Sequence, residues 1–191
     1  MNDLAIYNQH KHEMDTGDTL LYIGESFTGA TIGWWVGTFF KNRPDPTMPI
    51  FTHGNMVLRL KEFEGEIDRR WVLNADNRGA IPTLLSAYLE DYHGHCYWFP
   101  LKSQYDSNRV DIGCYALELA GRKYDYQGLI KNAIGLVNAE ANRVFCTESN
   151  FLSYRDGGKI VIGKKAPRPD LLPFLIGLDK QIVFSPHLQL F

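Results

Sequence analysis

The segment 143–152 places the strongest constraint on how this chain can fold. An apolar valine–phenylalanine pair runs directly into Cys146, which Thr147 and Glu148 follow. Small polar and acidic residues are typical of the first turn of a helix, so the segment predicts a helix that begins at Cys146. Free backbone N–H groups and the positive end of the helix dipole meet there, and both lower the pKa of a thiol. Cys146 is therefore a candidate nucleophile, and a buried structural cysteine is the alternative interpretation.

A thiol nucleophile needs a base within hydrogen-bond distance and a third group that orients the base. The sequence offers His53 near the start of one expected strand and Asn74 near the end of the next. If the two strands form an antiparallel hairpin, these residues lie at the same end of it. Cys146, His53 and Asn74 are thus the predicted catalytic residues. Asp76, two residues beyond Asn74 on the same strand face, is the alternative orienting group.

Hydrophobic spacing predicts a mixture of strands and helices. The expected strands cover 19–23, 51–60, 70–75, 96–99 and 181–184, and the expected helices cover 82–91 and 107–120. The second of these helices is expected to turn Val110, Cys114 and Leu117 toward the core, with Leu119 as a further candidate. An aromatic segment at 34–40 is either buried or presents an apolar surface to a ligand.

Length and charge narrow the functional classes. The chain of 191 residues fits a single domain over 1–191, with its core at 17–152 and a carboxyl-terminal extension at 158–191. A net charge of −2 without a basic cluster argues against nucleic acid as a partner. The most apolar run, 32–40, is shorter than the roughly 20 residues of a membrane span, and the amino terminus has no signal-peptide core. We expect no integral membrane segment and a cytoplasmic location, with export by lysis or another route left open.

The cysteines do not suggest a disulfide framework or a structural metal site. Cys96, Cys114 and Cys146 are odd in number and contain no CxxC pair. His93 and His95, next to Cys96, imitate a ligand cluster, but a metal needs three or four ligands with supporting groups. A turn followed by a strand is the preferred interpretation of that stretch. We therefore expect no metal and no other cofactor.

Five short motifs follow one another along residues 17–152. They are Gly17-Asp18 before a strand, Thr52-His53-Gly54-Asn55-Met56-Val57, Val72-Leu73-Asn74-Ala75 with Arg78-Gly79-Ala80 after it, Gly121-Arg122-Lys123-Tyr124-Asp125, and Phe145-Cys146-Thr147-Glu148. Each motif is weak alone, and their order makes the set specific. In this order the chain resembles the circularly permuted papain-like proteins of the NlpC superfamily, in the YiiX-like branch.

The resemblance implies an α+β fold of the permuted papain-like, NlpC type, in which a small antiparallel sheet or half-barrel packs against helices. It implies a cysteine-dependent hydrolase or acyltransferase that acts on an amide, peptide or lipid-acyl bond through a Cys–His–Asn triad and a thioester intermediate. Tyr124 and Tyr22 are the candidates for a second oxyanion donor or a substrate contact. The implied partner is a peptide, a cell-wall fragment or an acyl lipid.

Two departures from the family pattern keep a second hypothesis open. Many relatives carry glutamate where this chain has Asn74, and asparagine cannot stabilise an imidazolium by charge. In addition, His53 is followed directly by glycine, so we expect the strand register near it to differ from the usual spacing. The alternative is a catalytically inactive binding or structural module that retains the papain-like fold. Glu148 is expected to serve the start of its helix rather than catalysis.

Overall fold

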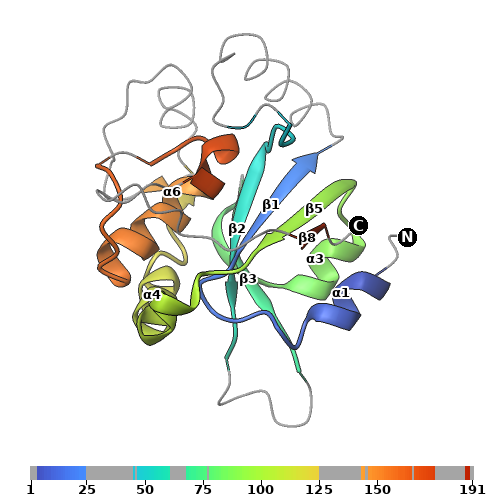
Figure 1. Cartoon of the computed structure of the whole chain (residues 1–191), viewed down its shortest axis with the longest axis horizontal. Helices are drawn as coiled ribbons and strands as arrows, with labels where there is room; N and C mark the ends of the chain where they lie inside the picture. The colour runs from blue at the N-terminus through green and yellow to red at the C-terminus, as the bar shows by residue number, and fades with distance from the viewer. Residues whose placement is uncertain are drawn as a thin grey trace.

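A six-stranded antiparallel sheet is the centre of the computed structural model (Figure 1). The structure describes residues 4–24, 45, 47–60, 68–76, 78–124, 143–144, 146–164, 166–174 and 188–189. Within these residues the strands lie in the order β4-β3-β2-β1-β5-β8. Their bounds are β1 Thr19–Gly24, β2 His53–Leu58, β3 Trp71–Asp76, β4 Gly79–Leu84, β5 Gly94–Phe99 and β8 Leu188–Gln189. A separate parallel pair joins β6 (Lys123–Tyr124) to β7 (Arg143–Val144).

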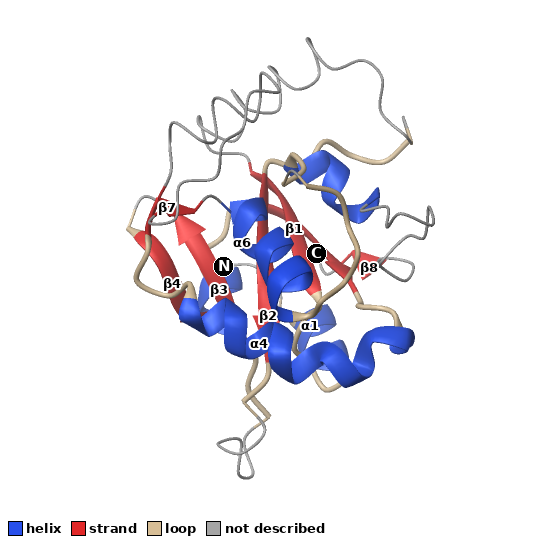
Figure 2. Ribbon diagram, turned by 90° about the vertical axis from the view of Figure 1, so that its left-hand side faces the viewer, coloured by secondary structure: helices blue, strands red, loops and turns tan. Residues whose placement is uncertain are grey.

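Helices cover both faces of this sheet, with α4 and α6 on one face and α1 and α3 on the other (Figures 1 and 2). The α-helices are α1 Ala5–His10, α3 Leu85–Glu90, α4 Arg109–Glu118 and α6 Cys146–Leu152. Two 3-10 helices, η2 Ser103–Asn108 and η4 Pro169–Phe174, and a π-helix, η3 Ser153–Gly157, complete the set in the described ranges. The architecture is α+β with an antiparallel sheet and packed helices, as the sequence predicts.

The four strands β1, β2, β3 and β5 send alternate side chains into two different cores. Leu21 of β1 and Met56 of β2 join a core with the buried residues of α4 and α6. Leu20 and Val57, their neighbours along the same strands, join a second core with residues of α1 and α3. The expected strands at 19–23, 51–60, 70–75 and 96–99 correspond to β1, β2, β3 and β5. The expected strand at 181–184 and the aromatic segment at 34–40 lie outside the described residues.

Asp18 ties the start of β1 to β5 and α4 through one buried carboxylate. Its side chain is 1% exposed. The indole N–H of Trp98 donates to it at 2.9 Å, the backbone N–H of Leu101 at 3.0 Å, and Arg109 Nη1 at 2.8 Å. Burial raises the pKa of Asp18, and the charge and hydrogen bond of Arg109 oppose that rise. The Gly17-Asp18 motif is thus a structural junction of three elements.

The helix expected over 82–91 was partly wrong, because its first residues belong to a strand. Pro82 lies in β4 opposite Leu73 of β3, and α3 begins only at Leu85. Proline lacks an N–H group, but among the described strands β4 is at the edge of the sheet, where no neighbouring strand needs that donor.

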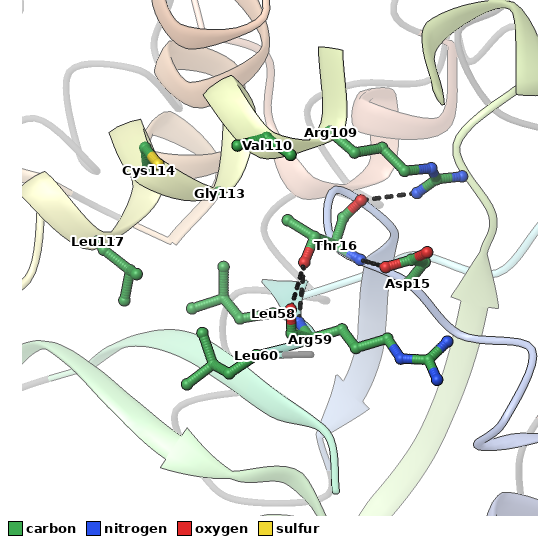
Figure 3. A pocket seen from close by; sticks show the side chains of 10 residues that line it. All are labelled: Asp15, Thr16, Leu58, Arg59, Leu60, Arg109, Val110, Gly113, Cys114 and Leu117. Atoms are coloured by element: carbon green, nitrogen blue, oxygen red, sulfur yellow. Dashed lines mark hydrogen bonds between the residues drawn. The ribbon is translucent and has the colours of Figure 1, made fainter. Parts of the chain in front are cut away.

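The predicted orientation of α4 was also wrong. Val110 is 74% exposed, Leu117 is 39% exposed, and Cys114 is exposed as well. The helix instead buries the face that contains Ile112, Gly113 and Ala116. A Cβ at Gly113 would lie 2.6 Å from Thr16 Cγ2. The glycine therefore lets α4 pack closer to Thr16 than the larger side chains of Val110, Cys114 and Leu117 would allow. Figure 3 shows Val110, Cys114 and Leu117 along a groove that is also lined by Leu58, the last residue of β2, and by Leu60 just after it.

Replacing Asp18 with alanine should lower the free energy of unfolding by about 3–5 kcal/mol, because a mostly buried guanidinium would lose its buried partner. Urea denaturation measures the change. The control is Asp106→Ala, which removes a mostly exposed carboxylate from the same Arg109 side chain and should cost about 0–1 kcal/mol. Equal losses in the two variants would contradict the role of Asp18 as a junction.

Candidate active site

Strands β2 and β3 separate at one end of the sheet, and the candidate site is built at this separation. Their register ends at the pair Met56 and Leu73, although both strands continue beyond it. Residues 53–55 go on pairing with β1, while residues 74–76 go on pairing with β4. Helix α6 packs against both β2 and β3 (Figure 2). The separation therefore leaves space at the point where the sequence places its candidate residues.

His53 and Asn74 contact each other at this end of the two strands. His53 Nε2 lies 2.9 Å from Asn74 Oδ1. An amide oxygen only accepts hydrogen bonds, so Nε2 carries the proton in this contact and Nδ1 remains for another partner. His53 is half-buried and Asn74 is 1% exposed. The structure thus brings together the base and the orienting group that the hairpin argument paired.

Asp76 lies one step behind this contact and fixes the orientation of the amide. Asn74 Nδ2 donates to Asp76 Oδ2 at 2.9 Å, which turns Asn74 Oδ1 toward His53. Arg78 in turn donates to Asp76 from its backbone N–H at 2.8 Å and from Nη2 at 2.8 Å. Burial would raise the pKa of Asp76, but the hydrogen bonds and charge of Arg78 outweigh it and lower the pKa. The ionised carboxylate of Asp76 therefore accepts a hydrogen bond from the neutral amide of Asn74.

Cys146 approaches the same point from the α6 side of the sheet. It is the first residue of α6 and is 1% exposed. Gly54 faces α6 at this point: a Cβ there would lie 2.9 Å from Leu21 Cδ2 and in ordinary contact, 3.5 Å, with Thr147 Cγ2, so no room remains for a larger side chain. The backbone N–H groups of Gly54 and Thr147 hydrogen-bond the Cys146 sulfur, and His53 forms a side-chain hydrogen bond with it.

The thiol and the imidazole shift each other's pKa in opposite directions. Burial would raise the pKa of Cys146, but the charge and hydrogen bond of His53 and the two backbone N–H groups lower it. Burial would lower the pKa of His53, but the charge and hydrogen bond of Cys146 and the hydrogen bond to Asn74 raise it. Both shifts favour a thiolate–imidazolium pair over two neutral side chains.

Two buried polar residues that the sequence reasoning did not single out hold α6 and η3 against β1. Tyr154 Oη donates to the Gly17 carbonyl at 2.7 Å and lies 2.6 Å from Thr19 Oγ1. Asn150 Nδ2 donates to Thr19 Oγ1 at 3.4 Å. Their signal in the sequence was two side chains with polar groups four residues apart, a spacing that places both on one helix face.

The remaining candidate residues, Tyr22, Tyr124 and Glu148, differ in how they are placed relative to His53 and Cys146. Tyr22 is fully buried, and its ring centroid lies 5.7 Å from that of His53. The backbone of Tyr124 pairs with Val144, two residues before Cys146, but its side chain lies outside the described residues. Glu148 is buried in the first turn of α6, and its charge acts on Arg155.

Within the described residues, no group of three or more His, Cys, Asp or Glu side chains is arranged to hold a metal ion. None of the helices in those ranges combines the length and apolar character that crossing a bilayer requires.

Comparison with known proteins relates the chain to a solved structure at the level of fold. The chain is similar to a crystal structure described as metalloprotein yiiX from Escherichia coli O157:H7, DUF1105. The TM-score is 0.55 and the sequence identity is 15%, over 91% of this chain and 87% of that chain. No protein-family model and no curated protein matches the sequence. The two proteins therefore share an overall fold.

Replacing Gly54 with valine should raise the pKa of Cys146 and lower stability by about 1–3 kcal/mol, because the added side chain pushes α6 away from β2. The ultraviolet absorbance of the thiolate during a pH titration measures the pKa. The matched control is Gly163→Val, since nothing lies within 4 Å of a Cβ built at Gly163. A Gly54→Val protein with an unshifted Cys146 pKa would show that this close approach does not stabilise the thiolate.

Proposed function

We propose that this chain is a cysteine-dependent hydrolase or acyltransferase with a permuted papain-like fold of the NlpC type. The single observation that carries the proposal is the contact between Cys146 and His53, with Asn74 bonded to the imidazole at Nε2. A nucleophile, a base and an orienting group of these types form the arrangement that acyl transfer through a thioester requires.

In the proposed reaction the Cys146 thiolate attacks the carbonyl carbon of an amide, peptide or lipid-acyl bond. The carbonyl oxygen takes up the negative charge, and the backbone N–H of Cys146 stabilises it. His53 then gives its proton to the leaving group, and a thioester with Cys146 remains. Water or another acceptor attacks the carbonyl carbon of this thioester while His53 takes up the acceptor's proton. The C–S bond then breaks, the acyl product leaves, and the thiolate–imidazolium pair is restored.

Asn74 and Asp76 divide in this proposal the role that a single acid has in many relatives. Asn74 holds His53 in the tautomer that leaves Nδ1 for the sulfur. Asp76 supplies the negative charge that an amide lacks, and Asn74 lies between this carboxylate and the imidazolium. The charge of His53 lowers the pKa of Asp76, and by reciprocity the Asp76 carboxylate stabilises the protonated imidazole.

The burial of Cys146 favours a second candidate function. With 1% of its surface exposed, the thiol is less accessible than a nucleophile that must meet a peptide or a lipid ester. A binding or structural module that retains the papain-like fold would have no need of an exposed sulfur. The two functions differ in one measurable property, the reactivity of the thiol.

Alkylation with iodoacetamide across pH tests the proposed function. In a Cys114→Ala background, which removes the exposed cysteine, we expect Cys146 to react at pH 6, where an ordinary thiol with a pKa of about 8.5 is only about 0.3% thiolate. The lowered pKa keeps the thiolate populated as the pH falls, and the rate declines only below that pKa. Replacing His53 with alanine should return the pH profile to that of an ordinary thiol.

His93→Ala is the matched control, since His93 is exposed and its loss should leave the profile unchanged. Cys96 contributes little label, because burial raises its pKa well above the ordinary value. A Cys146 thiol that stays inert up to pH 8, or that reacts identically with and without His53, would sink the enzyme and support the binding module.

A further inference from the structure

Three tyrosine rings form a connected aromatic group beside His53. The ring of Tyr22 is 5.7 Å from that of His53, 5.4 Å from that of Tyr88 and 4.9 Å from that of Tyr92. Tyr88 and Tyr92 stack on each other at 5.7 Å with an interplanar angle of 27°. Tyr22 is fully buried, whereas Tyr88 and Tyr92 are partly exposed. Part of each outer ring therefore reaches the surface.

Helix α3 and the strand after it place the two outer rings. Tyr88 lies in the second half of α3, and Tyr92 follows the end of that helix. At the start of β5, a Cβ on Gly94 would lie 3.1 Å from Tyr92 Cε1, so the glycine leaves room for the ring. We call Tyr88 and Tyr92 together the tyrosine wall.

The tyrosine wall lies within the electrostatic reach of the candidate nucleophile. Burial raises the pKa of Tyr88, and the nearby charges of Tyr92, Cys96 and Cys146 raise it further. A hydrogen bond to Asn55 opposes this rise, and Asn55 is two residues from His53 on the same strand. Asn55 Nδ2 also donates to Tyr22 Oη at 3.4 Å. The wall is thus connected to the same strand face that carries the base.

The arginine whose charge is coupled to Tyr88 is itself paired with a carboxylate. Arg78, which is close enough to Tyr88 to act on it electrostatically, is paired with Asp76 at 2.8 Å. Both Tyr22 and Tyr88 stay neutral at physiological pH, because burial raises the pKa of each. Aromatic rings in such a setting bind flat, uncharged groups through stacked or edge-to-face contacts.

We propose that Tyr88 and Tyr92 form the wall of a substrate subsite beside His53 that holds an uncharged aromatic ring of the substrate. This inference rests on the proposed function, because it assigns the ring to a substrate of Cys146. It adds a substrate class: acyl compounds with a flat ring within a few bonds of the reacting carbonyl.

A pair of alkylating probes tests the wall without a known substrate. N-benzyl-2-chloroacetamide and N-(cyclohexylmethyl)-2-chloroacetamide carry the same reactive group and rings of similar size, but only the first ring is flat. In each reaction the Cys146 sulfur bonds to the methylene carbon as the C–Cl bond breaks and chloride leaves. The ratio of the two rates reports recognition of the ring, and changes in thiol reactivity cancel from it.

In the Cys114→Ala background we expect the benzyl probe to label Cys146 about fivefold faster than the cyclohexylmethyl probe. The ratio should fall toward one in Tyr88→Leu and in Tyr92→Leu, because each loses one stacking ring. Tyr88→Phe keeps the ring and should keep the ratio. Tyr115→Leu makes the same change at a partly buried tyrosine of α4, across the sheet, and should also keep it.

The outcomes separate the two proposals. A ratio near one in the unaltered wall, or a ratio that stays at its original value in both leucine variants, would overturn the subsite while leaving the reactive cysteine in place. If neither probe nor 2-chloroacetamide labels Cys146, the proposed function fails and the subsite fails with it.

Discussion

The candidate site depends on one constraint, the separation of β2 from β3 beyond Met56 and Leu73. His53 pairs with Tyr22, and this register turns it toward the α3 side, whereas Cys146 packs in the core on the α6 side. A ladder that continued to the strand ends would keep those side chains on opposite faces of a closed backbone. Where the ladder ends, a sulfur from one face reaches an imidazole from the other.

Several contacts far from Cys146 and His53 fix the strands and α6 in the positions that create this separation. Asp18 joins β1 to β5 and α4, while Tyr154 and Asn150 join the α6–η3 segment to the same end of β1. Helix α6 thereby lies over β2 next to Gly54, where a side chain larger than a methyl group would have no room. The lowered pKa of Cys146 depends first on His53 and then on the backbone N–H groups of Gly54 and Thr147 that this packing brings to the sulfur.

The sequence predicted best what depends on local periodicity. Strand alternation and a hairpin suffice to pair His53 with Asn74, and the residues after Cys146 suffice to start a helix there. The orientation of α4 was not predictable in this way, because Val110, Cys114 and Leu117 repeat at helical spacing as well as the residues that are actually buried, Ile112, Gly113 and Ala116. Pro82 favoured a helix start, and only its place in the edge strand explains why it is tolerated in β4. The separation of β2 from β3 has no local signal, since it arises from pairing with two different neighbours.

The proposed chemistry requires that Cys146 and His53 form a thiolate–imidazolium ion pair. The pKa of His53 tests this pairing most directly. Nitrogen NMR of the imidazole across pH, compared between the unaltered protein and Cys146→Ala, measures this coupling. The account predicts that the pKa of His53 falls when the sulfur is removed, because burial then acts without the opposing thiolate. An identical His53 pKa in the two proteins would contradict it.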